Sequence, residues 1–223
     1  NSFRYDQPAL SLVLERLPAS FELVLSAMAI SIVVSIPLGI LSAIKRNTSL
    51  DLFISGFSVI GKAMPNFWIG IMLILLLSVV WKIFPVSGRG TLMHLVLPAV
   101  TLSTGIAAEM TRLIRSSMLE MLGQDYIQTA RSKGLREIWV IGKHALRNAL
   151  IPVVTISALQ MSQLIGGTLV TETVFSWPGL GQLVIMSVNT YDMPVIQAAV
   201  FVIAFIVIVT NLIADILLRF LDS

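Results

Sequence analysis

Five long apolar runs limit what this chain can fold into. They follow one another along most of the 223 residues and are separated by short polar segments. At roughly 1.5 Å of rise per residue, a helix of about 20 apolar residues matches a hydrocarbon layer about 30 Å thick. We therefore predict five membrane-spanning helices, at residues 21–44, 67–84, 92–114, 150–170 and 195–218.

The composition favours lipid over water as the solvent. Apolar residues make up 56% of the chain and charged residues only 12%, about half the share in typical soluble proteins. The mean hydropathy of +0.90 indicates more apolar surface than one soluble core can bury. We predict an all-α polytopic bundle that forms a single domain over residues 1–223, without internal repeats.

The basic residues predict how the bundle is oriented. Eleven Lys and Arg residues, Lys62 among them, fall in segments assigned to one side, and four fall on the other. Because Lys and Arg in short loops stay cytoplasmic, the start at Asn1 is expected outside and Ser223 inside. An outer start ahead of the first span is most simply explained by one more helix upstream, which makes six spans in the native protein.

Several function classes fit poorly. The net charge is +3, but the basic residues are scattered rather than gathered in an aromatic-studded patch, so nucleic acid binding is not expected. The chain has no cysteine, no Gly-x-Ser-x-Gly elbow, no His-Glu-x-x-His pair and no Gly-x-x-x-x-Gly-Lys-Ser/Thr loop, which disfavours a hydrolase, a metalloprotease or an ATPase. An ion-coupled secondary transporter remains open on composition alone.

The longest polar stretch, residues 115–148, is patterned as a cytoplasmic loop with two short helices. Asp125 is expected to cap the first helix, at about 125–135, and Gly134 to end it. Tyr126 and Ala130 lie on its apolar side, together with Ile127. Glu137 is expected to begin the second helix.

Several motifs together resemble those of a known family. Within the loop stand Tyr-Ile-Gln-Thr-Ala-Arg-Ser-Lys-Gly-Leu at 126–135 and His-Ala-Leu-Arg-Asn-Ala-Leu-Ile-Pro at 144–152. Outside it stand Met-Pro-Asn-Phe-Trp at 64–68, Thr-Glu-Thr-Val-Phe-Ser-Trp-Pro-Gly-Leu-Gly at 171–181 and Asp-Met-Pro-Val-Ile at 192–196. This pattern is similar to that of permease subunits of bacterial ATP-binding-cassette importers, in the dipeptide, oligopeptide and nickel branch.

The chain departs from the general family motif in the loop. Gln128 replaces a Glu, Thr129 replaces an Ala, and Arg147 stands where the motif has Pro. These changes resemble the form of the motif in the peptide and nickel branch.

The resemblance implies a type I importer-like permease in the bacterial inner membrane. Its expected partners are a homologous second permease, two ATP-binding subunits and an extracytoplasmic substrate-binding protein, with ATP and Mg²⁺ held by the partner ATPases and no cofactor on this chain. Peptides are the favoured cargo, and nickel or a nickel-chelator complex stays open. The coupling helix that contacts the ATPase would comprise Tyr126, Ile127, Gln128, Thr129, Ala130, Arg131, Lys133, Gly134 and Leu135.

Ionisable groups at bilayer depth need a reason, because they are costly there. Glu22 lies near the outer edge of its helix, where it snorkels or caps. The spacing of Glu109 from Arg112, and of Asp215 from Arg219, allows ion pairs within one helix.

The segment at 174–183 is too broken for a continuous helix and too apolar for a free loop, so we expect it at the external mouth. Polar groups that line a cavity or bond between helices are Ser157, Gln160, Ser162, Gln163 and Asn211. No metal ligands are assigned. The pathway or external gate candidates are Gln160, Gln163, Glu172, Phe175 and Trp177.

Overall fold

The computed structural model describes the backbone of residues 1–221 and the side chains of these residues except 162, 165, 217, 218, 220 and 221. Ser223 and the side chain of Ser162 therefore lie outside the described residues. The described chain is helical, in the order α1 (Ala9–Ile44), α2 (Ser49–Ala63), α3 (Asn66–Leu73), the π-helical η1 (Ile74–Val80), α4 (Leu92–Leu122), α5 (Asp125–Ser132), α6 (Glu137–Trp139), the π-helical η2 (Val140–Ala145), α7 (Leu146–Ala149), α8 (Ile151–Gly167), α9 (Leu169–Val174), α10 (Leu180–Asn189) and α11 (Met193–Leu221).

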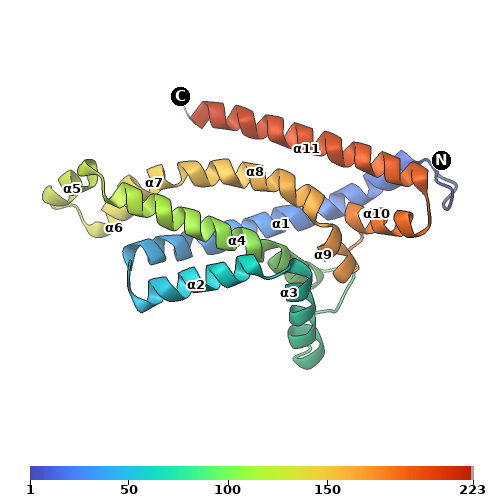
Figure 1. Cartoon of the computed structure of the whole chain (residues 1–223), viewed down its shortest axis with the longest axis horizontal. Helices are drawn as coiled ribbons and strands as arrows, with labels where there is room; N and C mark the ends of the chain where they lie inside the picture. The colour runs from blue at the N-terminus through green and yellow to red at the C-terminus, as the bar shows by residue number, and fades with distance from the viewer. Residues whose placement is uncertain (222–223) are drawn as a thin grey trace.

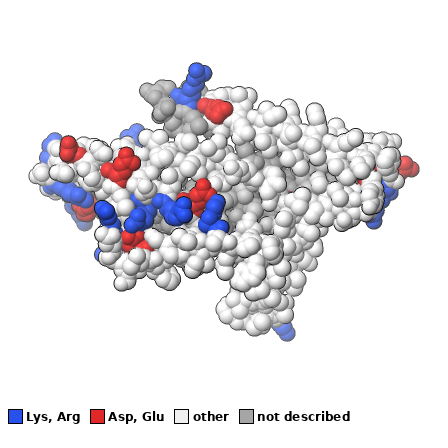
Figure 2. Space-filling view, in the orientation of Figure 1, with Lys and Arg blue, Asp and Glu red and all other residues white. Residues whose placement is uncertain are grey.

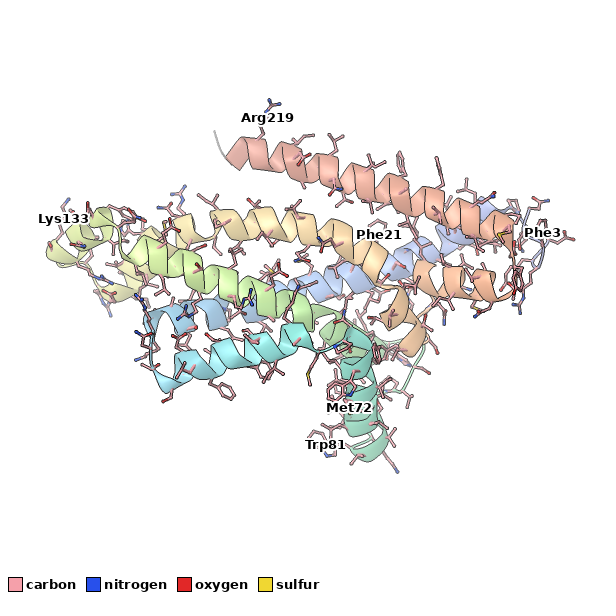
Figure 3. All side chains as sticks on the ribbon, in the orientation of Figure 1. Phe3, Phe21, Met72, Trp81, Lys133 and Arg219 are labelled. Atoms are coloured by element: carbon pink, nitrogen blue, oxygen red, sulfur yellow. The ribbon has the colours of Figure 1, made fainter. Side chains whose placement is uncertain are left out.

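The long helices run along one axis of an elongated molecule (Figure 1). α5 and α6 form one end of it, and the N-terminus, with α10 beside it, lies at the other. α3 leaves the bundle sideways, and Figure 3 labels Met72 and Trp81 along this projecting arm. The two ends of the bundle are therefore built from different parts of the sequence.

The main core forms where α1 packs along α4. Gly39 of α1 lies so close to α4 that a Cβ added there would be 2.6 Å from the Cβ of Ile114. A smaller core joins the start of α1 to α10 and α11. The fully buried side chains of the main core include Leu23, Val24, Ala27, Met110, Ile114 and Met118.

Three helices have the length and hydropathy of a membrane span: α1, α4 and α11 up to Ile216. They overlap the spans predicted at 21–44, 92–114 and 195–218 and confirm them as helices of that kind. The span predicted at 150–170 corresponds mainly to α8, whose 17 residues are just shorter than a span on these criteria. By length and composition the described residues thus hold three candidate spans, or four if the bent pair below counts as one.

The span predicted at 67–84 is confirmed only in part, because α3 and η1 qualify as a candidate span only together with α2. α2 and the α3 and η1 segment together pass as one candidate span, but they are bent by 104° at Met64 and Pro65. Proline disfavours the helical conformation of the residue before it, and Met64 has an extended ψ of 133°. The helix therefore breaks there, and α3 starts afresh in another direction.

Lys62, which the sequence predicts in a cytoplasmic loop, lies on a helix instead. Lys62 sits in the last turn of α2, and its ammonium contacts Glu109 on α4. Glu109 is 13 residues before Leu122, where α4 ends, which is about 20 Å of helix rise. Lys62 thus lies part of the way along the bundle from the α5 end, with an exposed side chain. The side of the membrane on which it lies stays a prediction.

Candidate functional site

The loop helix α5 is an exposed structure at the tip of the molecule. Figure 3 labels Lys133 there, at the end opposite Phe3. α5 runs from Asp125 to Ser132, and Gly134 follows with a φ of +75°. The expectation that Gly134 ends the helix is confirmed, since only glycine adopts this conformation without strain. Asp125 is the first helical residue rather than the cap, and Gln124 before it makes no side-chain capping bond.

The two faces of α5 differ from the sequence prediction. Ile127 is fully buried and Ala130 nearly so, and both belong to the core of this chain. They are therefore not free to enter a partner's cleft, because η2, in the second half of the loop, packs against α5. Tyr126 stays 41% exposed and Leu135 44% exposed. The exposed residues of the predicted coupling set are Tyr126, Gln128, Thr129, Arg131, Lys133, Gly134 and Leu135.

Polar contacts hold the loop in one shape. Arg131 of α5 and Glu137 of α6 form an ion pair, with Nη2 2.7 Å from Oε1. The hydrogen bonds from Arg131 lower the pKa of Glu137, and those to Glu137 raise the pKa of Arg131. Asn148 donates to the Tyr126 hydroxyl at 3.2 Å. Glu137 begins α6, as predicted. α5 and the turn after it are thus fastened at both ends.

Charge gathers at this end of the molecule (Figure 2). Lys and Arg side chains crowd the end that carries α5 and α6, and a second charged band crosses α2 and α4. Much of the remaining surface in this view is uncharged. The tip is therefore suited to polar or acidic groups of a partner, and the uncharged stretch to lipid or apolar protein.

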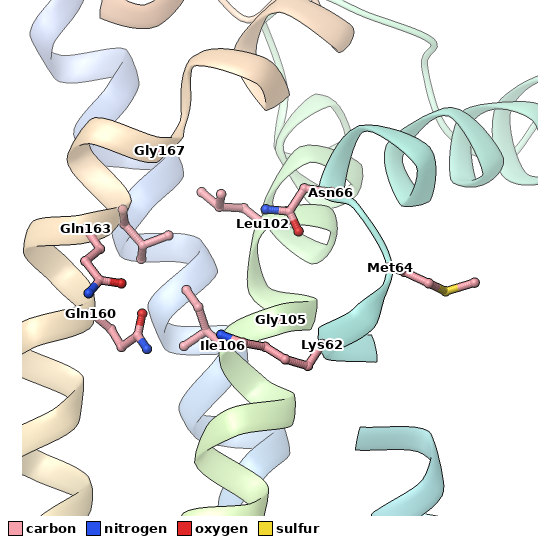
Figure 4. A pocket seen from close by; sticks show the side chains of 10 residues that line it. Lys62, Met64, Asn66, Leu102, Gly105, Ile106, Gln160, Gln163 and Gly167 are labelled. Atoms are coloured by element: carbon pink, nitrogen blue, oxygen red, sulfur yellow. The ribbon is translucent and has the colours of Figure 1, made fainter. Parts of the chain in front are cut away.

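A cavity of about 230 Å³ opens where α2 and α3 face α4 and α8 (Figure 4). Gln160 and Gln163, two of the pathway candidates, line it from α8, and their role in a pathway stays a prediction. Lys62 and Asn66 line it from the opposite side, whereas the Met64 side chain points away in Figure 4. The apolar and glycine positions of the wall are Leu102, Gly105, Ile106, Leu164 and Gly167.

Two of the ionisable groups predicted at bilayer depth, Glu22 and Glu109, pair with cations outside their own helices. Lys62 Nζ lies 2.6 Å from Glu109 Oε2, so the partner of Glu109 is on α2 rather than Arg112 on its own helix. Glu22 is paired with Arg89, with 2.9 Å between Nε and Oε2. The pairing of Asp215 with Arg219 stays a prediction.

The gate candidates Glu172, Phe175 and Trp177 are packed inside the protein near the N-terminal end. Trp177 is fully buried and donates its indole N–H to the carbonyl of Ala19 at 2.8 Å. Glu172 is also fully buried and accepts a hydrogen bond from Ser20 at 2.6 Å. The interruption predicted at 174–183 is confirmed, because α9 ends at Val174 and α10 begins at Leu180. These side chains fasten α9 and α10 to α1.

Among the described residues, no group of three or more His, Cys, Asp or Glu side chains is arranged to hold a metal ion. The cavity and the loop offer hydrogen-bonding groups, apolar contacts and the charged groups of two ion pairs, Lys62 with Glu109 and Arg131 with Glu137. Such groups can bind and release a solute or a partner.

The sequence of the chain matches a known protein family. The model of the binding-protein-dependent transport system inner membrane component matches residues 35–223.

The chain belongs to this family. It is an inner-membrane permease component and not an ATPase. Among the relatives of this permease, the oligopeptide transport system permease protein AppB of Bacillus subtilis is 45% identical over 229 residues, covering 98% of this chain and 72% of the relative. The dipeptide transport system permease protein DppB of Escherichia coli K12 is 42% identical over 233 residues, covering 91% and 69%.

The permease also shares its fold with solved transporters. A chain of the MetNI methionine ABC transporter, in an inward-facing conformation, matches with a TM-score of 0.82 and 19% identity, covering 97% of this chain and 99% of that one. A chain of an amino acid ABC transporter matches with a TM-score of 0.69 and 13% identity. At this identity the likeness concerns the fold alone.

Sequence reasoning missed two groups of residues in the permease. Lys62 and Asn66 were not assigned to the cavity, because α2 was not recognised as part of the bundle. The pair of Asp51 and Arg115, which joins α2 to α4, was missed for the same reason. Pro65 was the one signal in the sequence that could have revealed α2. It breaks a run of two helices, α2 before it and α3 after it, rather than ending a loop.

Proposed function

We propose that this permease is the membrane-spanning subunit of an ATP-driven importer of peptides. The support for this cargo comes from the relatives named for oligopeptide and dipeptide transport, which are 45% and 42% identical over 98% and 91% of the chain. A homologous second permease completes the translocation path, and the cavity lined by Gln160 and Gln163 is this chain's share of it. ATP and Mg²⁺ bind to partner subunits.

The mechanical part of the proposal depends on α5. A helix packed into a cleft of an ATPase transmits displacement, whereas a flexible loop absorbs it. α5 meets this requirement because Ile127 and Ala130 anchor one face in the core while Gln128, Thr129 and Lys133 stay exposed on the other. We infer that the exposed face, with Tyr126, Arg131 and Leu135 at its rim, seats in the ATPase.

The arrangement in the membrane follows from this contact. The α5 end is cytoplasmic, and the end with α9 and α10 faces a substrate-binding protein outside. α1, the bent pair of α2 and α3, α4, α8 and α11 act as five spans. α11 contacts lipid or the second permease, because only 11% of its most apolar stretch is buried within this chain. Phe175 and Trp177 brace the outer end beside Glu172.

Uptake by the reconstituted importer tests the function. The complex of both permeases, the ATPases and the binding protein is placed in proteoliposomes, and entry of a labelled dipeptide is followed with ion gradients collapsed by ionophores. Uptake should require ATP. Uptake that continues without ATP while an ion gradient is held would identify a secondary transporter. Entry of a nickel chelate but of no peptide would replace the proposed cargo.

A pair of glycine variants tests the coupling role. Gly134→Val forces a side chain into the left-handed region, where non-glycine residues cost about 1–2 kcal/mol, and should uncouple ATP hydrolysis from uptake while membrane insertion is kept. Gly142→Val is the matched control, because Gly142 lies in the same loop with open space around it and no positive φ. Normal transport by Gly134→Val, or an equal loss of transport in both variants, would contradict the role of α5 in coupling ATP hydrolysis to transport.

A further inference from the structure

The cavity between α2, α3, α4 and α8 has an uneven distribution of polar chemistry. Its polar side chains are one ammonium, from Lys62, and three amides, from Asn66, Gln160 and Gln163. Within the described residues no carboxylate lines it. The wall is thus rich in hydrogen-bond donors and carries a positive charge, next to the apolar surface of Leu102 and neighbouring residues.

Lys62 has donors left over for a ligand. An ammonium group has three N–H donors, and its recorded salt-bridge partner is Glu109 at 2.6 Å. The Lys62 side chain is 54% exposed, and Figure 4 shows it reaching across the cavity toward Ile106. Glu109 itself lies outside the lining. The ammonium therefore stands at the boundary between its protein partner and the open space.

The three amides add a second kind of recognition. Gln160 and Gln163 lie on α8 and Asn66 on α3, so donors and acceptors stand on opposite walls (Figure 4). A side-chain amide both donates and accepts, as a peptide bond does. A ligand with peptide bonds and a carboxylate can therefore bond to both walls and to Lys62 together.

We propose that this cavity binds the carboxylate end of a short peptide in transit, with Lys62 as the group that contacts the carboxylate. The inference rests on the proposed function and adds the recognising residue to it. The incoming carboxylate shares or replaces Glu109 on the ammonium, so the cation keeps a counter-charge at each stage. Among the described residues that line the cavity there is no carboxylate for the amino end of the peptide, whereas Lys62 offers a cation to the carboxylate end, which sets the direction in which the peptide lies.

The size of the cavity assigns the other half of the site to the partner permease. Complete small-molecule sites enclose roughly 300–1,000 Å³, whereas the volume of this cavity is about 230 Å³. The Lys62 wall therefore contributes one end of the binding site, and the remaining surface comes from the second permease.

Binding to the complete complex of permeases and ATPases, without the binding protein, tests the inference directly. Equilibrium binding of labelled alanyl-alanine is compared with that of its C-terminal amide. The wild-type complex should bind the free acid about tenfold or more tightly than the amide. Lys62→Gln should bring the two affinities within about twofold of each other, and Lys62→Arg should keep most of the preference.

Glu109→Gln is the matched control, because it removes the protein partner of Lys62 but keeps the cation. The preference for the free acid should persist or increase in this variant. The inference is overturned if Lys62→Gln keeps the wild-type preference, if the wild-type complex binds acid and amide equally, or if it binds neither. ATP-dependent dipeptide uptake measured on the same preparations separates the two levels: uptake without any preference rejects the Lys62 site alone, whereas no uptake rejects the proposed function.

Discussion

Arg115 of α4 donates two parallel hydrogen bonds to Asp51 of α2, from Nε to Oδ1 at 2.7 Å and from Nη2 to Oδ2 at 2.8 Å. Ser42 of α1 and the backbone N–H of Asn47 donate to the same carboxylate. Three segments are thus joined at one buried group, seven residues before α4 ends at Leu122 and the loop to α5 begins. Because this pair joins α2 to the end of α4 nearest the loop, we expect it to pass a displacement of α5 on to α2, whose last turn carries Lys62 at the cavity.

Breaking this pair on one side should destabilise the permease strongly. Arg115→Met leaves the carboxylate of Asp51, whose side chain is only 4% exposed, without a cation. The expected loss is about 3 kcal/mol, at the lower end for a buried pair because Arg115 is 28% exposed. The double variant with Asp51→Asn should recover part of the loss. Thermal unfolding in detergent measures both, and a double variant no more stable than Arg115→Met would contradict the explanation.

The two faces of α5 should respond differently to substitution. Ile127→Ala opens a cavity in the core, and its expected cost is roughly 2–5 kcal/mol of stability. Lys133→Glu changes only an exposed charge, so its stability should stay near that of the wild type, while its affinity for the ATPase falls. Co-purification of the ATPase and thermal unfolding, measured on both variants, distinguish the faces. Loss of ATPase binding from Ile127→Ala at unchanged stability would contradict the assignment.

The pair of Arg131 and Glu137 makes the order of the loop depend on pH. Hydrogen bonds from Arg131 lower the pKa of Glu137 below its ordinary value of 4.5. A carboxylate with a lowered pKa stabilises the folded loop above that ordinary value, and the contribution is lost as pH falls through the lowered pKa. The effect is small, because both side chains are about half exposed.

Amide hydrogen exchange over residues 131–139 measures this effect. At neutral pH the wild-type loop should be better protected than Glu137→Gln, and the difference should begin to fall near pH 4.5, vanish once the pH is below the lowered pKa, and shrink at high salt. Comparing the two proteins at the same pH removes the intrinsic pH dependence of exchange. Equal protection at neutral pH would show that the pair does not order the loop.

The long apolar helices were predictable because length and hydropathy leave few alternatives, but α2 was not. Its buried positions are Asp51, Ile54, Ser58 and Gly61, which recur with a helical period yet include only one apolar side chain. The large apolar side chains of α2, among them Leu52, Phe53 and Phe57, are exposed instead, and the helix passes as part of a span only together with α3 and η1. The charged pairs between helices were hidden for a related reason: Lys62 and Glu109 are 47 residues apart, whereas spacing rules see only neighbours within a helix.

In the loop, the bounds of the helices could be predicted from neighbouring residues, whereas the buried face of α5 could not. The end of α5 at Gly134 and the start of α6 at Glu137 are set by local backbone and charge preferences, and both were predicted. Which side of α5 faces the core depends on how the loop folds onto α4. That choice involves contacts with residues distant in sequence, so amphipathicity identified the apolar face of Ile127 and Ala130 but assigned it to the wrong partner.

The junction of α9 and α10 offers a prediction that depends on close packing. A Cβ added at Gly179 would overlap the carboxyl group of Glu172, which is held in place by Ser20 and by the backbone N–H of Gln182. Gly179→Ala should therefore displace that carboxyl, loosen α10 from α1 and destabilise the outer end of the bundle. Glu172→Ala removes the overlapping group and leaves space for the new methyl. The double variant should then lose less stability than the sum of the two single variants, because the clash no longer occurs. Thermal unfolding of the four proteins of this cycle measures the coupling, and strictly additive losses would show that the glycine is not required by Glu172.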